Sequence, residues 1–83
     1  MSRKLIENFW KNVERYQKLN HIADETFAKK LGISNPSWYN YRRSKSNVKL
    51  SRIEEIAKIL GVKPLDLLEV WTEKEWREVF EKG

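Results

Sequence analysis

The sequence has 83 residues, enough for one small domain, and its 17 Lys and Arg residues against 12 Asp and Glu residues give a net charge of +5. It contains no cysteine, which excludes disulfides, thiolate metal sites and a cysteine nucleophile and fits a reducing cytosol. Residues 1–10 are charged and lack an apolar signal segment, and no run approaches the roughly 20 apolar residues of a membrane span, so we expect a cytoplasmic chain that does not enter a membrane.

The first predicted element is a helix over residues 3–18. Its apolar residues recur at helical spacing and form one stripe: Leu5, Phe9, Val13 and Tyr16. Ile6 and Trp10 lie one helical turn apart beside that stripe and widen the apolar face. Because this face is wider than a single core stripe, we expect another part of the protein to cover the extra strip, which we call the Ile6/Trp10 strip.

A loop over residues 18–23 leads into a second helix, with Ala23 or Asp24 as its N-cap. Three apolar residues mark the inner face of this helix: Phe27, Ala28 and Leu31. Gly32 follows directly, at the position after a helix where a left-handed residue is needed and glycine adopts that conformation without a steric cost. The sequence therefore predicts that the second helix ends at Gly32 and that the chain turns tightly there.

The turn is followed by a third predicted helix, from about Pro36 to Arg43. Proline is accepted in the first turn of a helix, because its missing N–H would have no partner there. A residue that precedes proline avoids the helical region of backbone conformation. We therefore favour Asn35 as the N-cap of the third helix, with Ser34 as the alternative.

The two sides of the third helix differ in chemistry. Trp38 and Tyr41 lie three residues apart and should face inward, above Ile33 of the turn. The outward side and the loop after it are basic, since residues 35–52 contain five Lys or Arg residues and no acidic residue. A polyanion is the natural partner of such a segment.

A fourth helix and a short fifth helix should follow. The apolar pattern of the fourth helix consists of Leu50, Ile53, Ile56, Ala57 and Leu60, and Gly61 should end it. Ser51 and Glu54 have the spacing of a capping box, which places the start of the fourth helix within one turn of Ser51. Pro64 then opens the fifth helix, which runs to Leu68 or Val70.

Residues 71–83 form a C-terminal extension in which a further helix is expected over about residues 73–81. Thr72 and Glu75 have capping-box spacing, and Trp71 and Trp76 have the spacing of a hydrophobic staple. One face of this helix is apolar and consists of Trp76, Val79 and Phe80. We expect that face either to cover the Ile6/Trp10 strip of the first helix or to take part in a dimer contact.

Residues 5–68 resemble the lambda-repressor-like helix-turn-helix family of phage Cro proteins and repressors, the XRE type. The resemblance rests on a small residue where the helices cross, a turn glycine, an aliphatic residue after it and two large apolar positions: Ala28, Gly32, Ile33, Trp38 and Tyr41. It continues through the apolar pattern of the fourth helix. The resemblance implies an all-α, compact five-helix DNA-binding domain over residues 1–70, with the helix-turn-helix at residues 24–43 and an additional C-terminal helix.

The function that the resemblance implies is sequence-specific binding of double-stranded DNA by a small phage or prokaryotic transcriptional regulator, a repressor that binds as a homodimer. The third helix would lie in the major groove, where asparagine pairs with adenine and arginine with guanine. The residues expected to read bases are Asn35, Pro36, Tyr39, Asn40 and Arg43. Those expected to contact phosphates are Ser34, Ser37, Arg42, Lys45, Ser46 and Lys49.

Two positions depart from the family pattern. Phage repressors often begin the second helix with a glutamine that donates to a DNA phosphate, but the matching residue here is Asp24, which cannot donate when ionised. We expect that phosphate contact to be absent or replaced. The glycine usual after the third helix is Ser44 here, so we expect that helix to end differently.

The main alternative is a protein-interaction module on the same fold, such as an antitoxin whose partner covers the C-terminal aromatic surface, with DNA binding secondary. Enzyme function is not expected, because the sequence has no phosphate loop, no Gly-rich fingerprint and no paired carboxylates. His21 is the only histidine and should be a solvated loop residue. We therefore expect no metal ion and no cofactor.

Overall fold

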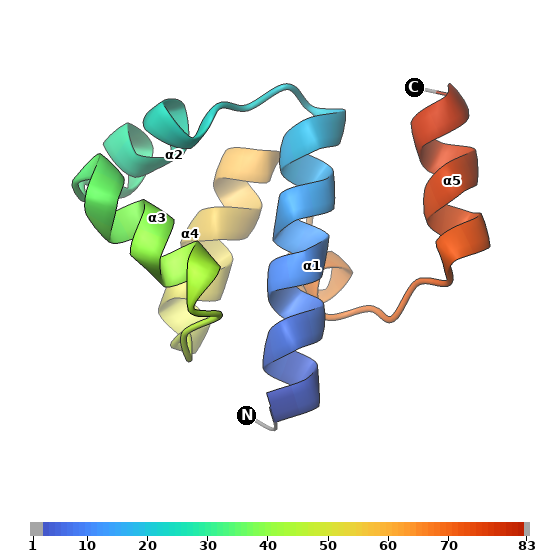
Figure 1. The fold of residues 1–83 in the computed structure, drawn as a ribbon, viewed down its shortest axis with the longest axis horizontal. Helices are drawn as coiled ribbons and strands as arrows, with labels where there is room; N and C mark the ends of the chain where they lie inside the picture. Colours follow the sequence, from blue (N-terminus) through green and yellow to red (C-terminus); the bar gives the residue numbers. More distant parts are fainter. Residues whose placement is uncertain (1–2, 83) are drawn as a thin grey trace.

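Helices account for the regular structure in the computed structural model, which describes residues 3–82 of the backbone and the side chains of residues 3–78. They are α1 (Arg3–Leu19), α2 (Asp24–Leu31), α3 (Asn35–Arg43), α4 (Leu50–Leu60), the one-turn 3₁₀ helix η1 (Pro64–Leu67) and α5 (Glu73–Lys82). α1 stands at the centre, with α2, α3 and α4 on one side of it and α5 on the other (Figure 1). The all-α prediction is confirmed, and the expected fifth helix is the single turn η1.

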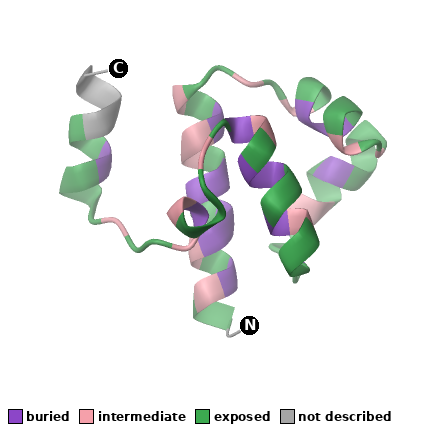
Figure 2. Cartoon of the chain, turned by 180° about the vertical axis from the view of Figure 1, so that it is seen from behind, coloured by how far each residue is buried: buried purple, intermediate pink, exposed green. Residues whose placement is uncertain are grey.

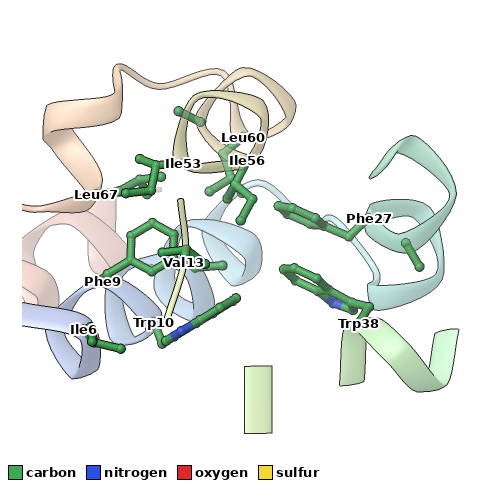
Figure 3. Packing of buried hydrophobic residues seen from close by; sticks show 13 residues of the cluster. Ile6, Phe9, Trp10, Val13, Phe27, Trp38, Ile53, Ile56, Leu60 and Leu67 are labelled. Atoms are coloured by element: carbon green, nitrogen blue, oxygen red, sulfur yellow. The ribbon is translucent and has the colours of Figure 1, made fainter. Parts of the chain in front are cut away.

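The core lies between α1, α4 and η1 and extends outward to α2 and α3. Phe9 and Val13 of α1 are fully buried and face Ile56 of α4 and Leu67 of η1 (Figure 3). At the other end of the cluster, the rings of Phe27 in α2 and Trp38 in α3 stack with their centroids 4.4 Å apart. This stack joins α2 to α3, and the contact of the Trp38 ring with the Trp10 ring attaches the helix-turn-helix segment to α1.

The Ile6/Trp10 strip is covered by α3 and by the loop that follows it. The Trp10 ring lies 5.8 Å from the Trp38 ring and 5.9 Å from the Tyr41 ring, measured between centroids. Its indole Nε1 donates to the backbone carbonyl of Ser46 at 2.8 Å. Of the two roles predicted for the C-terminal helix, cover of this strip is therefore wrong, because the α3–α4 loop crosses α1 at that place. The dimer contact stays a prediction.

α5 contacts a different side of α1. Trp76 is buried, with its ring centroid 5.4 Å from that of Tyr16 and the guanidinium of Arg15 4.9 Å from its ring centre. Glu73 pairs with Arg15 at 2.6 Å and with Lys11 at 3.1 Å. The described part of α5 is otherwise mostly exposed (Figure 2).

The start of α5 agrees with the sequence prediction. The hydroxyl of Thr72 accepts a hydrogen bond from the backbone N–H of Glu75 at 3.1 Å, as an N-cap does. The rings of Trp71 and Trp76 lie 4.9 Å apart, which confirms the hydrophobic staple. The expected apolar face also included Val79 and Phe80, whose side chains lie outside the described residues.

α4 begins within one turn of Ser51, as predicted, but without the predicted capping box. α4 begins at Leu50 after Lys49, which makes no side-chain cap, so the capping box of Ser51 and Glu54 is not formed. Val48 is buried against the core and brings the chain into the helix immediately after it, which leaves Ser51 inside the first turn. Leu50 points outward with 74% of its surface exposed.

Asparagines of α1 attach the segment before α5, a role that the sequence did not reveal. Asn12 is fully buried, and its amide donates to the carbonyls of Leu67 at 2.8 Å and Glu69 at 2.7 Å. The amide of Asn8 donates to the carbonyl of Glu69 at 2.9 Å.

No helix in the described range, residues 3–82, combines the length and the apolar character needed to cross a membrane.

Candidate nucleic-acid interface

The turn between α2 and α3 has the geometry that its glycine predicted. Gly32 is left-handed, with φ at 72°. Its N–H donates to the carbonyl of Lys29 at 3.2 Å, and the N–H of Ile33 donates to the carbonyl of Ala28 at 3.0 Å. These bonds satisfy the last carbonyls of α2 and set the angle at which the chain enters α3.

α3 begins one residue earlier than we favoured from the sequence. Ser34 is the N-cap, with an extended backbone and its hydroxyl accepting from the N–H of Ser37 at 3.2 Å. Asn35 occupies the first helical position and Pro36 the second. Because the first N–H groups of a helix have no internal partner, proline costs no hydrogen bond at the second position either.

The outward face of α3 presents the residues that were expected to read bases. Asn35, Pro36, Asn40 and Arg43 are exposed, and the Tyr39 ring has 51% of its surface exposed. The guanidinium of Arg42 lies 5.7 Å from the centre of the Tyr39 ring. These five expected base-reading residues therefore share one solvent-facing surface next to the basic loop.

The inward face of α3 is held by Trp38, of which only 1% is exposed. Beyond its stacking on Phe27, its indole Nε1 donates to Oδ1 of Asp24 at 2.9 Å. A buried indole N–H needs an acceptor, and Asp24 supplies it from the first residue of α2. The bond joins α2 to α3 and fixes the rotation of α3 about its axis.

Asp24 accepts from two further side chains, and we call the set Gln17, Asp24, Trp38 and Arg42 the Asp24 cluster. The amide of Gln17 in α1 donates to Oδ1 of Asp24 at 2.7 Å, and Nη1 of Arg42 in α3 lies 3.2 Å from the same oxygen. Nη1 of Arg42 also donates to Oε1 of Gln17 at 3.4 Å. Three helices therefore meet at one carboxylate.

The charge of Asp24 is stabilised by these contacts. Burial opposes ionisation of the carboxyl, but the hydrogen bonds from Gln17 and Trp38 and the charge of Arg42 outweigh it and lower the pKa of Asp24 below its ordinary value. The departure from the family pattern at this position thus has a structural role. In place of a donor toward DNA, Asp24 is an acceptor toward the interior.

The Asp24 cluster also changes the position expected of Arg42. Its side chain is only 26% exposed, and its Nη1 is paired with Oδ1 of Asp24. The sequence carried one signal for this arrangement, since an inward-facing tryptophan requires an acceptor for its indole N–H. That signal did not identify the acceptor, because Gln17, Asp24 and Arg42 belong to three different helices.

The loop after α3 combines exposed lysines with serines that bond to one another. Ser44 donates its hydroxyl to the carbonyl of Asn40 at 2.7 Å, so Ser46 is the donor in the 2.6 Å contact between the two serine hydroxyls. Lys45 and Lys49 are exposed. At the start of α3, the hydroxyl of Ser34 donates to the hydroxyl of Ser37 at 2.8 Å, which leaves the hydroxyl hydrogen of Ser37 available.

α3 ends differently from the family pattern, as expected. Ser44, at the position of the usual glycine, has a right-handed φ of −80°. The left-handed conformation falls on Lys45 instead, with φ at 51°. The N–H of Ser46 then donates to the carbonyl of Tyr41 at 3.2 Å, which closes the end of the helix.

In a comparison with known protein families, residues 10–73 match the model described as Cro/C1-type HTH DNA-binding domain. Comparisons with curated proteins and with solved structures give no significant match. The matched range contains the whole of α2, the turn, α3 and α4, which is the part of the fold that presents the exposed face of α3. The chain belongs to the Cro/C1-type helix-turn-helix family, a family of DNA-binding regulators.

Proposed function

We propose that this protein is a sequence-specific transcriptional repressor of phage or bacterial type that inserts α3 into the major groove of double-stranded DNA. One observation carries the proposal. The inner face of α3 is fixed by Trp38 and the Asp24 cluster, while its outer face consists of exposed polar side chains beside a loop with no acidic residue. A rigid helix with such a face suits a groove that is about 12 Å wide.

Base reading falls to side chains that make no hydrogen bond or ion pair within the described part of the protein. Asn35 and Asn40 have free amides that fit the N6 and N7 atoms of adenine, and Arg43 has a free guanidinium that fits O6 and N7 of guanine. Pro36 offers an apolar contact to a thymine methyl group. Tyr39 stands beside them and reaches either a base or a phosphate.

Phosphate contacts set the register of the protein on DNA and supply most of its salt-dependent affinity. We assign them to Lys45, Lys49 and the hydroxyl of Ser37, which have donors to offer. Ser34 and Ser46 already donate their hydroxyl hydrogens within the protein, and Arg42 is paired with Asp24. We therefore propose that Arg42 positions α3 and contributes little to phosphate binding.

Binding as a two-fold dimer would place two copies of α3 in successive major grooves, at half-sites about 34 Å apart. Occupancy of such a site excludes other proteins from it, which is why repression is the proposed outcome. The stoichiometry is measured by sedimentation of the protein on a duplex that carries its selected site. Two chains per duplex support the dimer, and one chain per duplex removes it from the proposal.

The proposed function is tested by selection from a random duplex library, followed by mobility shifts over a range of salt concentrations. We expect enrichment of one two-fold-related sequence, bound at least about 10³ times more tightly than unrelated duplexes at the same salt concentration. If the selected pool shows no common sequence and every duplex binds equally even at low salt, the protein is not a sequence-specific regulator.

A further inference from the structure

A hollow of about 350 Å³ lies between the start of α1 and the loop that follows α3. Figure 1 shows that both segments lie at the same end of the molecule. The residues that line the hollow are Arg3, Ile6, Ser44, Lys45, Ser46 and Asn47. Two of them are cationic and none is acidic, so the hollow is suited to an anion.

The walls of the hollow are fixed by contacts within the protein. Ile6 is buried at its base, with only 4% of its surface exposed. The carbonyl of Ser46 accepts from the indole of Trp10 at 2.8 Å, which attaches the loop to α1. The hydroxyls of Ser44 and Ser46 bond to each other. Because these contacts hold the loop against α1, binding would require little rearrangement of the backbone.

Arg3 is the charged group that α1 brings to the hollow. Its side chain is 70% exposed, and its Nε lies 3.3 Å from Oε1 of Glu7, one helical turn away. An ion pair between two exposed side chains is weak, so the guanidinium can leave Glu7 for a stronger anion. Lys45, in the loop two residues after the end of α3, lines the same hollow.

We propose that this hollow binds a phosphate of the DNA backbone, with Arg3, Lys45 and the amide of Asn47 as its donors. The inference rests on the proposed function and extends the DNA interface from α3 to the start of α1. Arg3 lies outside residues 10–73, the range that matches the helix-turn-helix family. The contact would add affinity and fix the register of the protein on DNA without choosing a sequence.

The test compares two substitutions at opposite ends of α1. Arg3→Ala removes the proposed contact. Lys18→Ala is its matched control, because Lys18 also has a 70% exposed side chain and also lies 3.3 Å from a glutamate one turn away, Glu14. Each variant loses one positive charge. The dissociation constants of the full chain are measured by fluorescence anisotropy between 50 and 200 mM salt, on the selected duplex and on an unrelated one.

The salt slope is the slope of the logarithm of the binding constant against the logarithm of the salt concentration. Arg3→Ala should lower its magnitude by about 0.9, so that the affinity of the variant falls about threefold less than that of the wild type between the two salt concentrations. At 50 mM salt it should bind both duplexes more weakly by the same factor, and Lys18→Ala should match the wild type. If Arg3→Ala and Lys18→Ala have the same salt slope and the same affinities, the hollow is not a phosphate site. In that case the proposed function still stands if the wild type prefers the selected duplex over the unrelated one. If the wild type binds no duplex, both proposals fail.

Discussion

Asp24 joins three helices, so its removal should destabilise the helix-turn-helix. Asp24→Ala leaves the buried indole N–H of Trp38 and the buried amide of Gln17 without their acceptor. An unpaired buried donor is costly, so we expect the free energy of unfolding to fall by about 2–3 kcal/mol in urea titrations. Glu25→Ala is the control, because Glu25 is also acidic, lies in the same helical turn and is exposed. A loss of equal size at Glu25 would show that helix charge, and not the Asp24 cluster, causes the effect.

The stability of the protein should depend on pH through the same carboxyl. The folded-state pKa of Asp24 lies below its ordinary value, so the unfolded chain takes up a proton first as the pH falls. The stabilisation of the folded state by ionised Asp24 is therefore complete above about pH 5, where the carboxyl is ionised in both the folded and the unfolded chain. It is lost as the pH falls through the lowered pKa of the folded state. Asp24→Asn should lose stability at pH 7 and show a smaller further loss between pH 5 and 2. If Asp24→Asn loses as much stability between pH 5 and 2 as the wild type does, Asp24 is not the carboxyl responsible.

Lys45 combines a strained backbone with a proposed phosphate contact, and two substitutions separate these properties. Lys45→Gly should raise the free energy of unfolding by about 0.5–1 kcal/mol, because its φ of 51° suits glycine better than any residue with a Cβ atom. Lys45→Ala retains the strain and should leave stability nearly unchanged. Both variants lose the ammonium group and should weaken binding to all duplexes equally. Unequal DNA binding by the two variants would show that the loop conformation, and not the charge, is what DNA senses.

Some residue roles could be predicted from the sequence and others could not. The inward position of Trp38 and the left-handed Gly32 follow from local spacing, and the structure has both. Asn35 was favoured as the N-cap of α3 because a residue before proline avoids the helical region. In the structure the hydroxyl of Ser34 caps the helix and Asn35 is helical. Arg42 was placed among the phosphate contacts because its charge is visible in the sequence, whereas its partner Asp24 is adjacent only in the folded protein.

At the scale of elements, the described side chains of α5 attach it to α1 by few contacts. These contacts include the Trp76 ring, packed against Tyr16 and Arg15, and the ion pairs of the exposed Glu73, which contribute little because Glu73 is solvated. Trp76→Ala should therefore lower stability by about 2 kcal/mol and remove hydrogen-exchange protection from residues 73–82. The amides of α2, α3 and α4 should keep their protection.

Lys74→Ala is a suitable control for that experiment, since Lys74 is exposed on the same helix. It should leave the exchange rates of α5 unchanged. If Trp76→Ala has no effect in the monomer but shifts the sedimentation coefficient at high concentration, the Trp76 side chain serves a contact between chains. That outcome would overturn the intramolecular role of α5.

The sequence predicted where the helices end better than how they pack. Gly32, Gly61 and Thr72 act locally, so their effects on helix boundaries can be recognised from the residue type and its neighbours. The cover of the Ile6/Trp10 strip is a tertiary property. Trp10 could have been covered by any apolar face, and only the path of the α3–α4 loop decides that α3 covers it.

At the scale of the whole molecule, charge and rigidity coincide at α3. The segment from residue 35 to residue 52 holds five basic residues and no acidic one, and the Asp24 cluster joins the helix within it to α1 and α2. Electrostatic attraction would therefore bring any DNA to this face, and the exposed amides of α3 would choose among sequences. Affinity and specificity should therefore be carried by different residues.

The most direct test of that claim is the affinity of Asn40→Ala for a set of duplexes in which each base pair of the selected site is changed in turn. Asn40 is exposed, so its loss should leave the fold intact. If Asn40 reads one adenine, the variant should lose about 1–3 kcal/mol on the selected site and no longer distinguish the base pairs at one position. Lys45→Ala should weaken every duplex alike. An equal loss for Asn40→Ala on selected and unrelated duplexes would contradict the account.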